Sequence, residues 1–158
     1  MSSDQRLLIT GASGFVGGHL LEAVLRQRPD WPVNAWYFGK APAAAAGVRW
    51  TAVDLESAQA VTESVRQAQP THVVHLAAAA DVGGSFSNPR ATWTVNVMGT
   101  LNLLEALRTE APEANLLLVS SSEVYGDSFN TGKALTEDAP LSPQNPYAAS
   151  KAAAELLA

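Results

Sequence analysis

The sequence predicts an α/β protein in which a doubly wound parallel sheet lies between layers of helices. Short apolar runs alternate with longer segments of helical periodicity, and a glycine-rich turn, G-A-S-G-F-V-G at residues 11–17, directly follows the first run. Strands that alternate with helices form parallel sheets. Right-handed crossovers then predict the strand order 3-2-1-4-5, with ligands bound at the carboxyl ends of the strands where the order reverses. Together these observations indicate a three-layer Rossmann architecture.

Each element follows from one of two patterns. Buried parallel strands are short continuous apolar runs, and helices carry apolar residues three and four positions apart until a proline or glycine stops them. The strands expected on this basis are residues 7–10, 33–38, 48–53, 72–76 and 116–120. The helices expected are residues 15–28 before Pro29, 57–69 before Pro70, about 89–110, and a last one that begins near Pro146. The alanine-rich segment 39–47 is expected to be a loop.

Length and composition point to one domain without disulfides. The chain has 158 residues, of which 47% are hydrophobic and 16% charged, and no apolar run approaches the roughly 20 residues of a membrane span. A net charge of −5 without a basic stretch gives no support to a nucleic-acid partner. Because Cys is absent, disulfides, zinc–thiolate sites and thiol nucleophiles are excluded, and no metal site is expected. The N-terminus lacks the pattern of a signal peptide, so we expect a cytoplasmic protein with no membrane partner.

The glycine-rich turn has the spacing of a dinucleotide-binding site. Gly11 permits a tight turn, Gly14 lets the backbone approach a pyrophosphate, and Gly17 allows the helix to pack closely on the strand. The pyrophosphate would bind main-chain amides at the helix N-terminus. Glycine-rich turns also occur for packing alone, so the prediction depends on a second motif.

The second motif is P-Y-A-A-S-K at residues 146–151, in which Tyr147 and Lys151 lie four residues apart at the start of a predicted helix. Residues at that spacing project from one face of a helix. A lysine ammonium near a phenol favours the phenolate, which makes Tyr147 usable as an acid and a base near neutrality. An exposed helix pair is the alternative. Found together with the glycine turn, the pair indicates hydride chemistry on a small molecule.

Six blocks of the sequence resemble the extended short-chain dehydrogenase/reductase family, the NAD(P)-dependent nucleotide-sugar epimerases, dehydratases and reductases. They are G-A-S-G-F-V-G at 11–17, V-D-L at 53–55, H-L-A-A at 75–78, N-V-M-G-T-L-N-L-L-E-A at 96–106, S-S-S-E-V-Y-G at 120–126 and N-P-Y-A-A-S-K at 145–151. Members of this family are longer than the present chain. The resemblance therefore implies that residues 1–158 are the NAD(P)-binding Rossmann domain with its catalytic residues, truncated before a C-terminal substrate domain.

The resemblance also implies a set of cofactor-binding residues. Beside the three glycines, it comprises Ser13, Phe15 and Val16 of the turn, Asp54 and Leu55 after the third strand, Leu76, Ala77 and Ala78 at the end of the fourth, and Asn96, Tyr147 and Lys151. Asp54 would cap the adenine amino group, Asn96 would support the active-site backbone, and Lys151 would bond the nicotinamide ribose. His75, in a buried strand, is expected to be a hydrogen-bonded core residue rather than a catalytic base.

The end of the second strand favours NADP(H) over NAD(H). An acidic residue usually ends this strand, about 20 residues beyond the glycines, and binds the ribose 2′-hydroxyl. Here the strand ends in W-Y-F-G-K at 36–40 with no carboxylate, and Lys40 can neutralise a 2′-phosphate. A solvated loop lysine is the alternative interpretation of Lys40.

The remaining site residues also come from the resemblance. Ser121 would hydrogen-bond the reacting sugar oxygen, Ser122 would also bind substrate, and Ser85 would contact it from the substrate-facing loop 81–89. Glu123 would remove a proton or orient the substrate after oxidation at C4, as in GDP-mannose 4,6-dehydratases. A solvated loop carboxylate is the alternative for Glu123.

These residues predict a nucleotide-sugar enzyme that transfers a hydride at sugar C4, in the manner of a GDP-mannose-type dehydratase or a 4-keto-6-deoxy-sugar reductase. A UDP-sugar 4-epimerase or decarboxylase, or a non-catalytic NAD(P)-binding module, is the alternative. The 158-residue chain alone is expected to bind cofactor without turnover. Relatives commonly dimerise through four helices, so we expect a homodimer through the helices at 89–110 and 146–158.

Overall fold

The computed structural model describes residues 5–158, and in these residues five strands form one sheet in which every neighbouring pair is parallel. The strand order is β3-β2-β1-β4-β5, which confirms the predicted topology. The strands are β1 (Leu7–Thr10), β2 (Val33–Tyr37), β3 (Val48–Ala52), β4 (His72–His75) and β5 (Asn115–Leu118). The central strand β1 is buried along its whole length and pairs with every residue of β4.

The chain divides into two compact units. Unit 1 comprises the described residues up to Ala77 together with Asn102–Val119, and unit 2 comprises Ala78–Leu101 and Ser120–Ala158. The helices around the sheet in unit 1 are α1 (Phe15–Gln27), α2 (Ala58–Ala68) and most of α5 (Gly99–Glu110). The helical segments of unit 2 are α3 (Val82–Ser87), α4 (Pro89–Trp93), a π-helical turn (Thr94–Met98), a 3-10 helix (Ser122–Thr131) and α6 (Pro146–Leu157). None of the helices within residues 5–158 is long and apolar enough to cross a bilayer.

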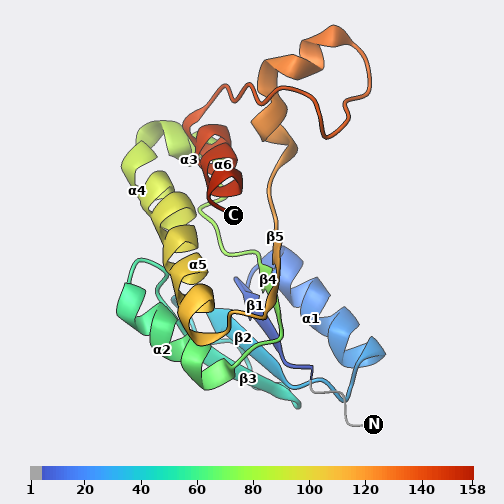
Figure 1. Ribbon diagram of the computed structural model, residues 1–158, viewed down its shortest axis with the longest axis vertical. Helices are drawn as coiled ribbons and strands as arrows, with labels where there is room; N and C mark the ends of the chain where they lie inside the picture. The colour runs from blue at the N-terminus through green and yellow to red at the C-terminus, as the bar shows by residue number, and fades with distance from the viewer. Residues whose placement is uncertain (1–4) are drawn as a thin grey trace. The chain divides into compact units, whose positions relative to one another are not determined.

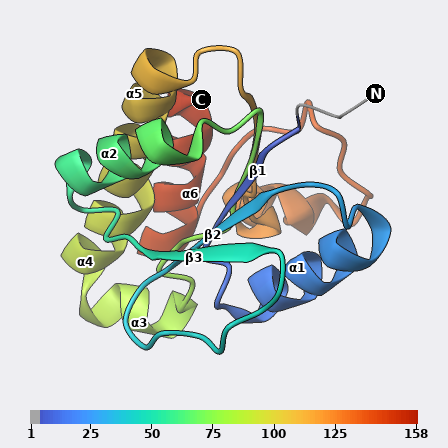
Figure 2. The ribbon, with the colours of Figure 1, turned by 90° about the horizontal axis from the view of Figure 1, so that it is seen from below.

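The sheet of unit 1 lies between two helical layers. The helix α1 covers one face, and α2 and α5 cover the other (Figure 1, Figure 2). On the α1 side the core contains Ile9 packed with Leu21, and on the other side it contains Leu8 packed with Val61 and Leu103. Successive residues of β1 thus face opposite layers, as the two-residue period of a strand requires. Burial on both faces explains why the central strand β1 is almost entirely apolar.

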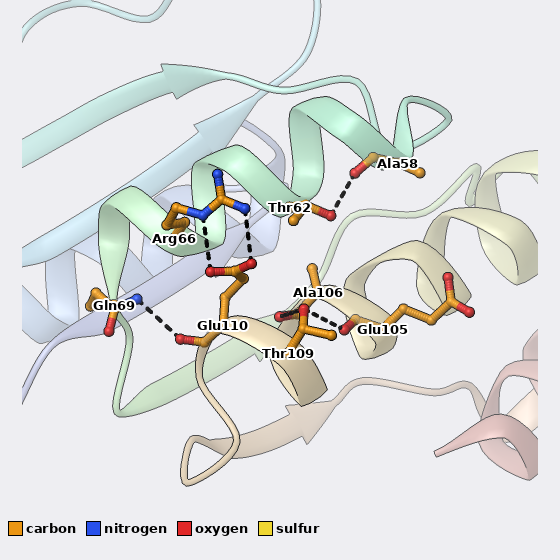
Figure 3. A network of polar contacts seen from close by, with 8 residues as sticks. All are labelled: Ala58, Thr62, Arg66, Gln69, Glu105, Ala106, Thr109 and Glu110. Carbon is orange, nitrogen blue, oxygen red and sulfur yellow. Dashed lines mark hydrogen bonds and ion pairs between the residues drawn. The ribbon is translucent and has the colours of Figure 1, made fainter.

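Polar contacts join α2 to α5 near their C-terminal ends. The guanidinium of Arg66 in α2 donates two hydrogen bonds of 3.0 Å to the carboxylate of Glu110 in α5 (Figure 3). This pairing lowers the pKa of Glu110 and raises that of Arg66, mainly through the side-chain hydrogen bond. The side-chain amide of Gln69 donates to the main-chain carbonyl of Glu110 at 3.0 Å, which satisfies one of the last carbonyls of α5.

Unit 2 differs from the prediction in three places. The helix α3 occupies most of the expected loop 81–89, the expected helix 89–110 contains a π-helical turn, and residues 122–131 form a 3-10 helix that was not expected. Within the unit, α6 packs against α3, α4 and the π-helical turn. The buried face of α6 therefore belongs to a helical cluster.

Candidate functional site

The glycine-rich turn connects β1 to α1 within unit 1. Gly11 has a φ of +67°, a conformation that favours glycine, and a Cβ atom on it would lie 2.7 Å from the main-chain nitrogen of Ala77. Gly17 is buried, and a Cβ atom there would lie 2.6 Å from Cα of Ala12. The backbone is packed so closely at both positions that neither has room for a side chain.

The N-terminus of α1 has no side-chain cap. Its N-cap residue, Gly14, offers no side-chain acceptor to the N–H groups of the first turn. The starts of three other α-helices are capped by side chains, those of Ser57 in α2, Asn88 in α4 and Asn145 in α6. Uncapped N–H groups at a helix start carry partial positive charge and bind anions. Three more predicted cofactor residues surround this end and are exposed: Ser13, Phe15 and Val16.

Three other predicted cofactor residues follow β2 and β3. Lys40 is exposed in the loop after β2. Asp54 is also exposed, and its Oδ1 accepts a hydrogen bond from the main-chain N–H of Glu56 at 2.9 Å. Leu55 is buried in the core on the α2 side of the sheet. Lys40 and Asp54 are thus accessible to a ligand, whereas the side chain of Leu55 serves the core.

A buried polar contact fixes the end of β4. His75 is 2% exposed, and its Nδ1 lies 2.6 Å from the hydroxyl of Thr10 at the end of β1. The same hydroxyl accepts a hydrogen bond from the main-chain N–H of Ala77 at 3.1 Å. Leu76 and Ala77, both predicted to face the cofactor, are half-buried here. His75 is therefore the hydrogen-bonded core residue that was predicted, and Thr10 is a supporting residue that the sequence analysis missed.

In unit 2, α6 carries Tyr147 and Lys151 one helical turn apart. Both are largely buried, with 9% and 6% of their surface exposed. Asn145 caps the helix, because its Oδ1 accepts a hydrogen bond from the main-chain N–H of Ala148 at 2.7 Å, and a proline occupies the first helical position. Burial lowers the pKa of Lys151, and the carboxylate of Glu155 opposes this shift.

A buried network ties α6 to the π-helical turn. Asn96, 2% exposed, donates from Nδ2 to the hydroxyl of Ser150 at 2.9 Å, and Ser150 donates to the carbonyl of Tyr147 at 2.7 Å. The Asn96 amide also accepts from the N–H of Ala79 at 2.7 Å and donates to its carbonyl at 3.2 Å. Ala78, another predicted cofactor residue, directly precedes Ala79 and is half-buried. Asn96 thus supports the backbone, which is the role that the resemblance implies, and a contact between Asn96 and cofactor stays a prediction.

Ser85 lies inside unit 2 and does not face outward from a loop. It belongs to α3 and is fully buried, and its hydroxyl donates to the carbonyl of Val82 at 2.6 Å and accepts from the main-chain N–H of Tyr147 at 3.3 Å. The direct substrate contact expected of Ser85 is not available in this conformation. The resemblance implied a substrate-facing loop at 81–89, whereas the chain forms a helical turn in which Ser85 is buried. Ser85 therefore holds the first turn of α6.

The S-S-S-E segment follows β5 and begins the 3-10 helix. Ser121 is its N-cap, and its hydroxyl accepts a hydrogen bond from the main-chain N–H of Glu123 at 3.2 Å. Ser122 and Glu123 are exposed. The Oε2 atom of Glu123 accepts a hydrogen bond from Nδ2 of Asn145 at 3.0 Å. The structure thus connects the predicted carboxylate to the start of α6, a link that the sequence analysis did not anticipate.

Gly126 allows the later segment around Ser142 to pack closely against the 3-10 helix. It has a φ of +42° and a non-helical ψ, and a Cβ atom on it would lie 2.8 Å from the carbonyl carbon of Ser142. The main chain of Ser142 donates to the carbonyl of Val124 at 3.0 Å and accepts from the N–H of Asp127 at 3.3 Å. These bonds hold the segment that leads into α6 beside the 3-10 helix.

The parallel sheet, the glycine turn and the Ser, Tyr and Lys side chains define a Rossmann-type protein of the short-chain dehydrogenase/reductase class. The family model for GDP-mannose 4,6 dehydratase matches residues 8–158. The chain belongs to this family of NAD-dependent epimerases and dehydratases, as the resemblance implied.

Relatives in this family carry different activities. The chain is 35% identical to a dTDP-glucose 4,6-dehydratase of Mycobacterium tuberculosis, over 96% of its own length and 47% of the relative's, and 35% identical to a GDP-6-deoxy-D-mannose reductase of Pseudomonas aeruginosa, over 97% and 46%. Among solved structures it is similar to a UDP-glucose 4-epimerase of Thermus thermophilus in complex with NAD, with a TM-score of 0.85, 37% identity and coverage of 96% and 49%. It is also similar to the Pseudomonas aeruginosa protein RMD complexed with NADPH, with a TM-score of 0.77, 34% identity and coverage of 97% and 46%. The chain spans about half the length of the curated relatives it matches.

Proposed function

We propose that this chain is the cofactor-binding and catalytic part of an NAD(P)-dependent nucleotide-sugar enzyme that transfers a hydride at sugar C4. The observation that carries the proposal is the fixed start of α6. There Tyr147 and Lys151 lie one turn apart, and the main chain of Tyr147 is held by Ser85 on one side and Ser150 on the other. Such fixation suits an acid/base residue, because proton transfer requires a defined geometry.

The glycine turn fits a dinucleotide. The uncapped start of α1 offers main-chain N–H groups to a pyrophosphate, and Gly14 presents no side chain between the backbone and that ligand. Asp54 is exposed and can accept from the adenine amino group. When bound, NAD(P) supplies the acceptor and the donor of the hydride.

The residues of α6 and of the segment after β5 handle the proton. Tyr147 takes a proton from the sugar hydroxyl as the hydride leaves and returns it on reduction, and Ser121 orients the same oxygen, with Ser122 as a further substrate contact. The partly desolvated site of Lys151 lowers its pKa, and the same surroundings strengthen the attraction between its ammonium and a phenolate. Lys151 is thus proposed to act together with Tyr147, one helical turn away on α6.

We infer a preference for NADP(H) because Lys40, and no carboxylate, follows β2. One of the similar structures contains NAD and another contains NADPH, so the inference about cofactor preference rests on the residues of this chain. The test is a titration with NADPH and NADH, followed by nucleotide fluorescence and by quenching of the four tryptophans. We expect tighter binding of NADPH, lost in Lys40→Ala and retained in Lys133→Ala, a control at another exposed lysine. Equal affinity for both nucleotides in the unaltered chain would overturn the preference.

The reaction depends on Glu123. We propose a GDP-mannose-type dehydratase or a 4-keto-6-deoxy-sugar reductase, because an exposed carboxylate is hydrogen-bonded beside the start of α6. A UDP-sugar 4-epimerase or decarboxylase is the second candidate, supported by the similarity to an epimerase. In a dehydratase, Glu123→Gln abolishes elimination of water and spares hydride transfer, whereas a pure reductase tolerates the change. Incubation of a chain extended by the unmatched part of the relatives with dTDP-glucose, GDP-mannose and UDP-glucose, followed by product analysis, separates these cases.

Residues 1–158 are proposed to form the cofactor domain, with sugar-nucleotide binding completed by the part of the relatives that this chain does not match. We therefore expect the chain to bind NAD(P) without completing turnover. Full turnover of any of the three nucleotide sugars by this chain would disprove that division of labour. Loss of cofactor binding in Gly14→Val, with an unchanged thermal unfolding midpoint, would support the assignment of the glycine turn.

We further infer a cytoplasmic homodimer that uses the segment 89–110 and α6. In unit 2 the side chains of Phe86, Trp93 and Met98 are exposed, and a shallow groove of about 430 Å³ runs along α4 and the π-helical turn. Exposed apolar patches of this kind mark interaction surfaces. Light scattering on Trp93→Glu is expected to show monomers, with Phe129→Glu, an exposed aromatic outside these helices, as the control that stays dimeric. A monomeric unaltered chain would rule the proposal out.

A further inference from the structure

Asn145 uses both ends of its side-chain amide. Its Oδ1 accepts from the N–H of Ala148 at 2.7 Å, and its Nδ2 donates to Oε2 of Glu123 at 3.0 Å. We propose that Asn145 is a positioning residue, whose amide holds the Glu123 carboxylate in one orientation at the start of the helix that carries Tyr147. The mechanistic importance of this role rests on the proposed function of Glu123 in proton transfer.

The chemistry of the groups determines this arrangement. A main-chain N–H can only donate, so the cap of α6 must use the oxygen of Asn145. An ionised carboxylate can only accept, so the nitrogen of the same amide must face Glu123. The orientation of the amide is therefore set by partners on both sides. A charged acceptor strengthens the bond from Nδ2, and the positive end of the helix favours a carboxylate near its start.

Glu123 is also fixed through its main chain. Its N–H donates to the hydroxyl of Ser121 at 3.2 Å, and the bonds between Ser142 and the 3-10 helix bring the approach to α6 alongside. Without Asn145, the carboxylate would keep its main-chain position but lose the one hydrogen bond that the structure gives to its side chain within the described residues. The Glu123 carboxylate is thus bound at the N-terminus of α6, the same end of the helix that carries Tyr147.

A second capping asparagine shows that the cap alone does not require a carboxylate. Asn88 precedes Pro89 just as Asn145 precedes Pro146, and its Oδ1 accepts from the N–H of Ala91 at 3.1 Å. Among residues 5–158, no hydrogen-bond partner is found for Nδ2 of Asn88. The two positions therefore share the cap and differ in the second contact, which makes Asn88 an internal control.

The test compares Asn145→Ser with Asn88→Ser. Serine caps a helix about as well as asparagine, so both variants keep the cap, but serine lacks the amide donor. In the chain labelled with ¹³C and ¹⁵N, three-bond couplings of Glu123 report whether its side chain occupies one rotamer. We expect one rotamer in the unaltered chain and in Asn88→Ser, and averaging among rotamers in Asn145→Ser, with similar thermal unfolding midpoints for all three. A single rotamer of Glu123 in Asn145→Ser would overturn the proposal, as would averaging in the unaltered chain.

A kinetic measurement then links orientation to chemistry. This measurement uses a chain extended by the part of the relatives that residues 1–158 do not match. With bound cofactor and either dTDP-glucose or GDP-mannose, the ratio of elimination to hydride transfer is expected to fall by up to about 100-fold in Asn145→Ser and to stay unchanged in Asn88→Ser, because misplacement of a catalytic group by about 1 Å costs that much. Asn145→Asp, which keeps the cap and replaces the donor with a second carboxylate, is expected to lose at least as much. An unchanged ratio in both Asn145 variants would contradict a positioning role. Absence of hydride transfer in the extended chain without substitutions would instead count against the proposed function, and the rotamer measurement on residues 1–158 would still decide the role of Asn145.

Discussion

Replacement of Gly17 by alanine tests whether the glycine turn is as tightly packed as the structure shows. A Cβ atom on Gly17 would lie 2.6 Å from Cα of Ala12 and still closer to the carbonyl oxygen of Gly11, whereas ordinary van der Waals contact begins at 3.4 Å. The backbone must therefore separate by at least 0.8 Å (3.4 minus 2.6). The obstacle is main chain, which cannot turn aside as a flexible side chain can. Overpacking of this kind costs about 1–3 kcal/mol.

The neighbouring glycine provides a matched control. Gly18 lies in the same helix and a Cβ atom on it would contact nothing within 4 Å. Alanine is favoured over glycine in a helix by roughly 0.5–1 kcal/mol, and this gain is common to both variants. The difference in stability between Gly18→Ala and Gly17→Ala therefore isolates the overpacking cost, about 1–3 kcal/mol.

Urea unfolding followed by tryptophan fluorescence measures this difference. With a slope of about 2 kcal/mol per molar urea, the midpoint of Gly17→Ala should lie about 0.5–1.5 M below that of Gly18→Ala. NAD(P)H titration of the same samples should show weaker binding only in Gly17→Ala, because the displaced turn moves the amides at the start of α1. Equal midpoints and equal affinities in the two variants would refute the reasoning.

Three further changes test other contacts. Ser85→Ala removes the acceptor of a main-chain N–H at the start of α6 and should lower stability by about 1–3 kcal/mol, whereas Ser87→Ala, at an exposed position of the same helix, should not; equal urea midpoints would contradict this role. Arg66→Gln should lower the free energy of unfolding at neutral pH, and this loss of stability should disappear in acid. The stabilisation by the ion pair is fully present above the ordinary carboxyl pKa of 4.5 and is lost as the pH falls through the lowered pKa of Glu110. A loss of stability that does not depend on pH would exclude the ion pair as its source. The lowered pKa of Lys151 means that the unfolded chain binds more protons between that pKa and 10.5, so stability relative to Lys151→Met should rise with pH across this interval, and urea unfolding that shows a constant difference would speak against the shift.

The sheet could be predicted because its information is local. A strand that is buried on both faces needs apolar side chains on both, so it is a short apolar run in the sequence. In β1, Leu8 lies in the core on one side of the sheet and Ile9 in the core on the other. The glycine turn could be placed because Gly11 and Gly17 are required by backbone geometry that recurs wherever a strand turns tightly into a helix. The start of α6 could also be predicted, because asparagine followed by proline is a typical signal for a helix start.

The interior of unit 2 could not be predicted because its contacts join residues far apart in sequence. The resemblance implied a substrate-facing loop at 81–89, but Ser85 belongs to the helix α3 and its hydroxyl accepts a hydrogen bond from the main chain of α6. The apolar residues of segment 89–110 keep a regular helical spacing in the sequence, so the pattern does not reveal the π-helical turn. This turn contains Asn96, which donates a hydrogen bond to Ser150. The bond between Glu123 and Asn145 crosses 22 residues of irregular chain, and no spacing rule connects them.

The division of the chain into two units has a consequence for its biosynthesis. Unit 1 is complete once Val119 has been translated, because β5 closes the sheet, whereas unit 2 extends to Ala158. These further 39 residues (158 minus 119) take roughly 2–8 s at a translation rate of about 5–20 residues per second. At the start of that interval the amide of Asn96 lacks the hydroxyl of Ser150, and α4 lacks the helix α6 that packs against it. Ribosome stalling or codon choice in this stretch would therefore act on a nascent chain that has a finished sheet and an unfinished helical cluster.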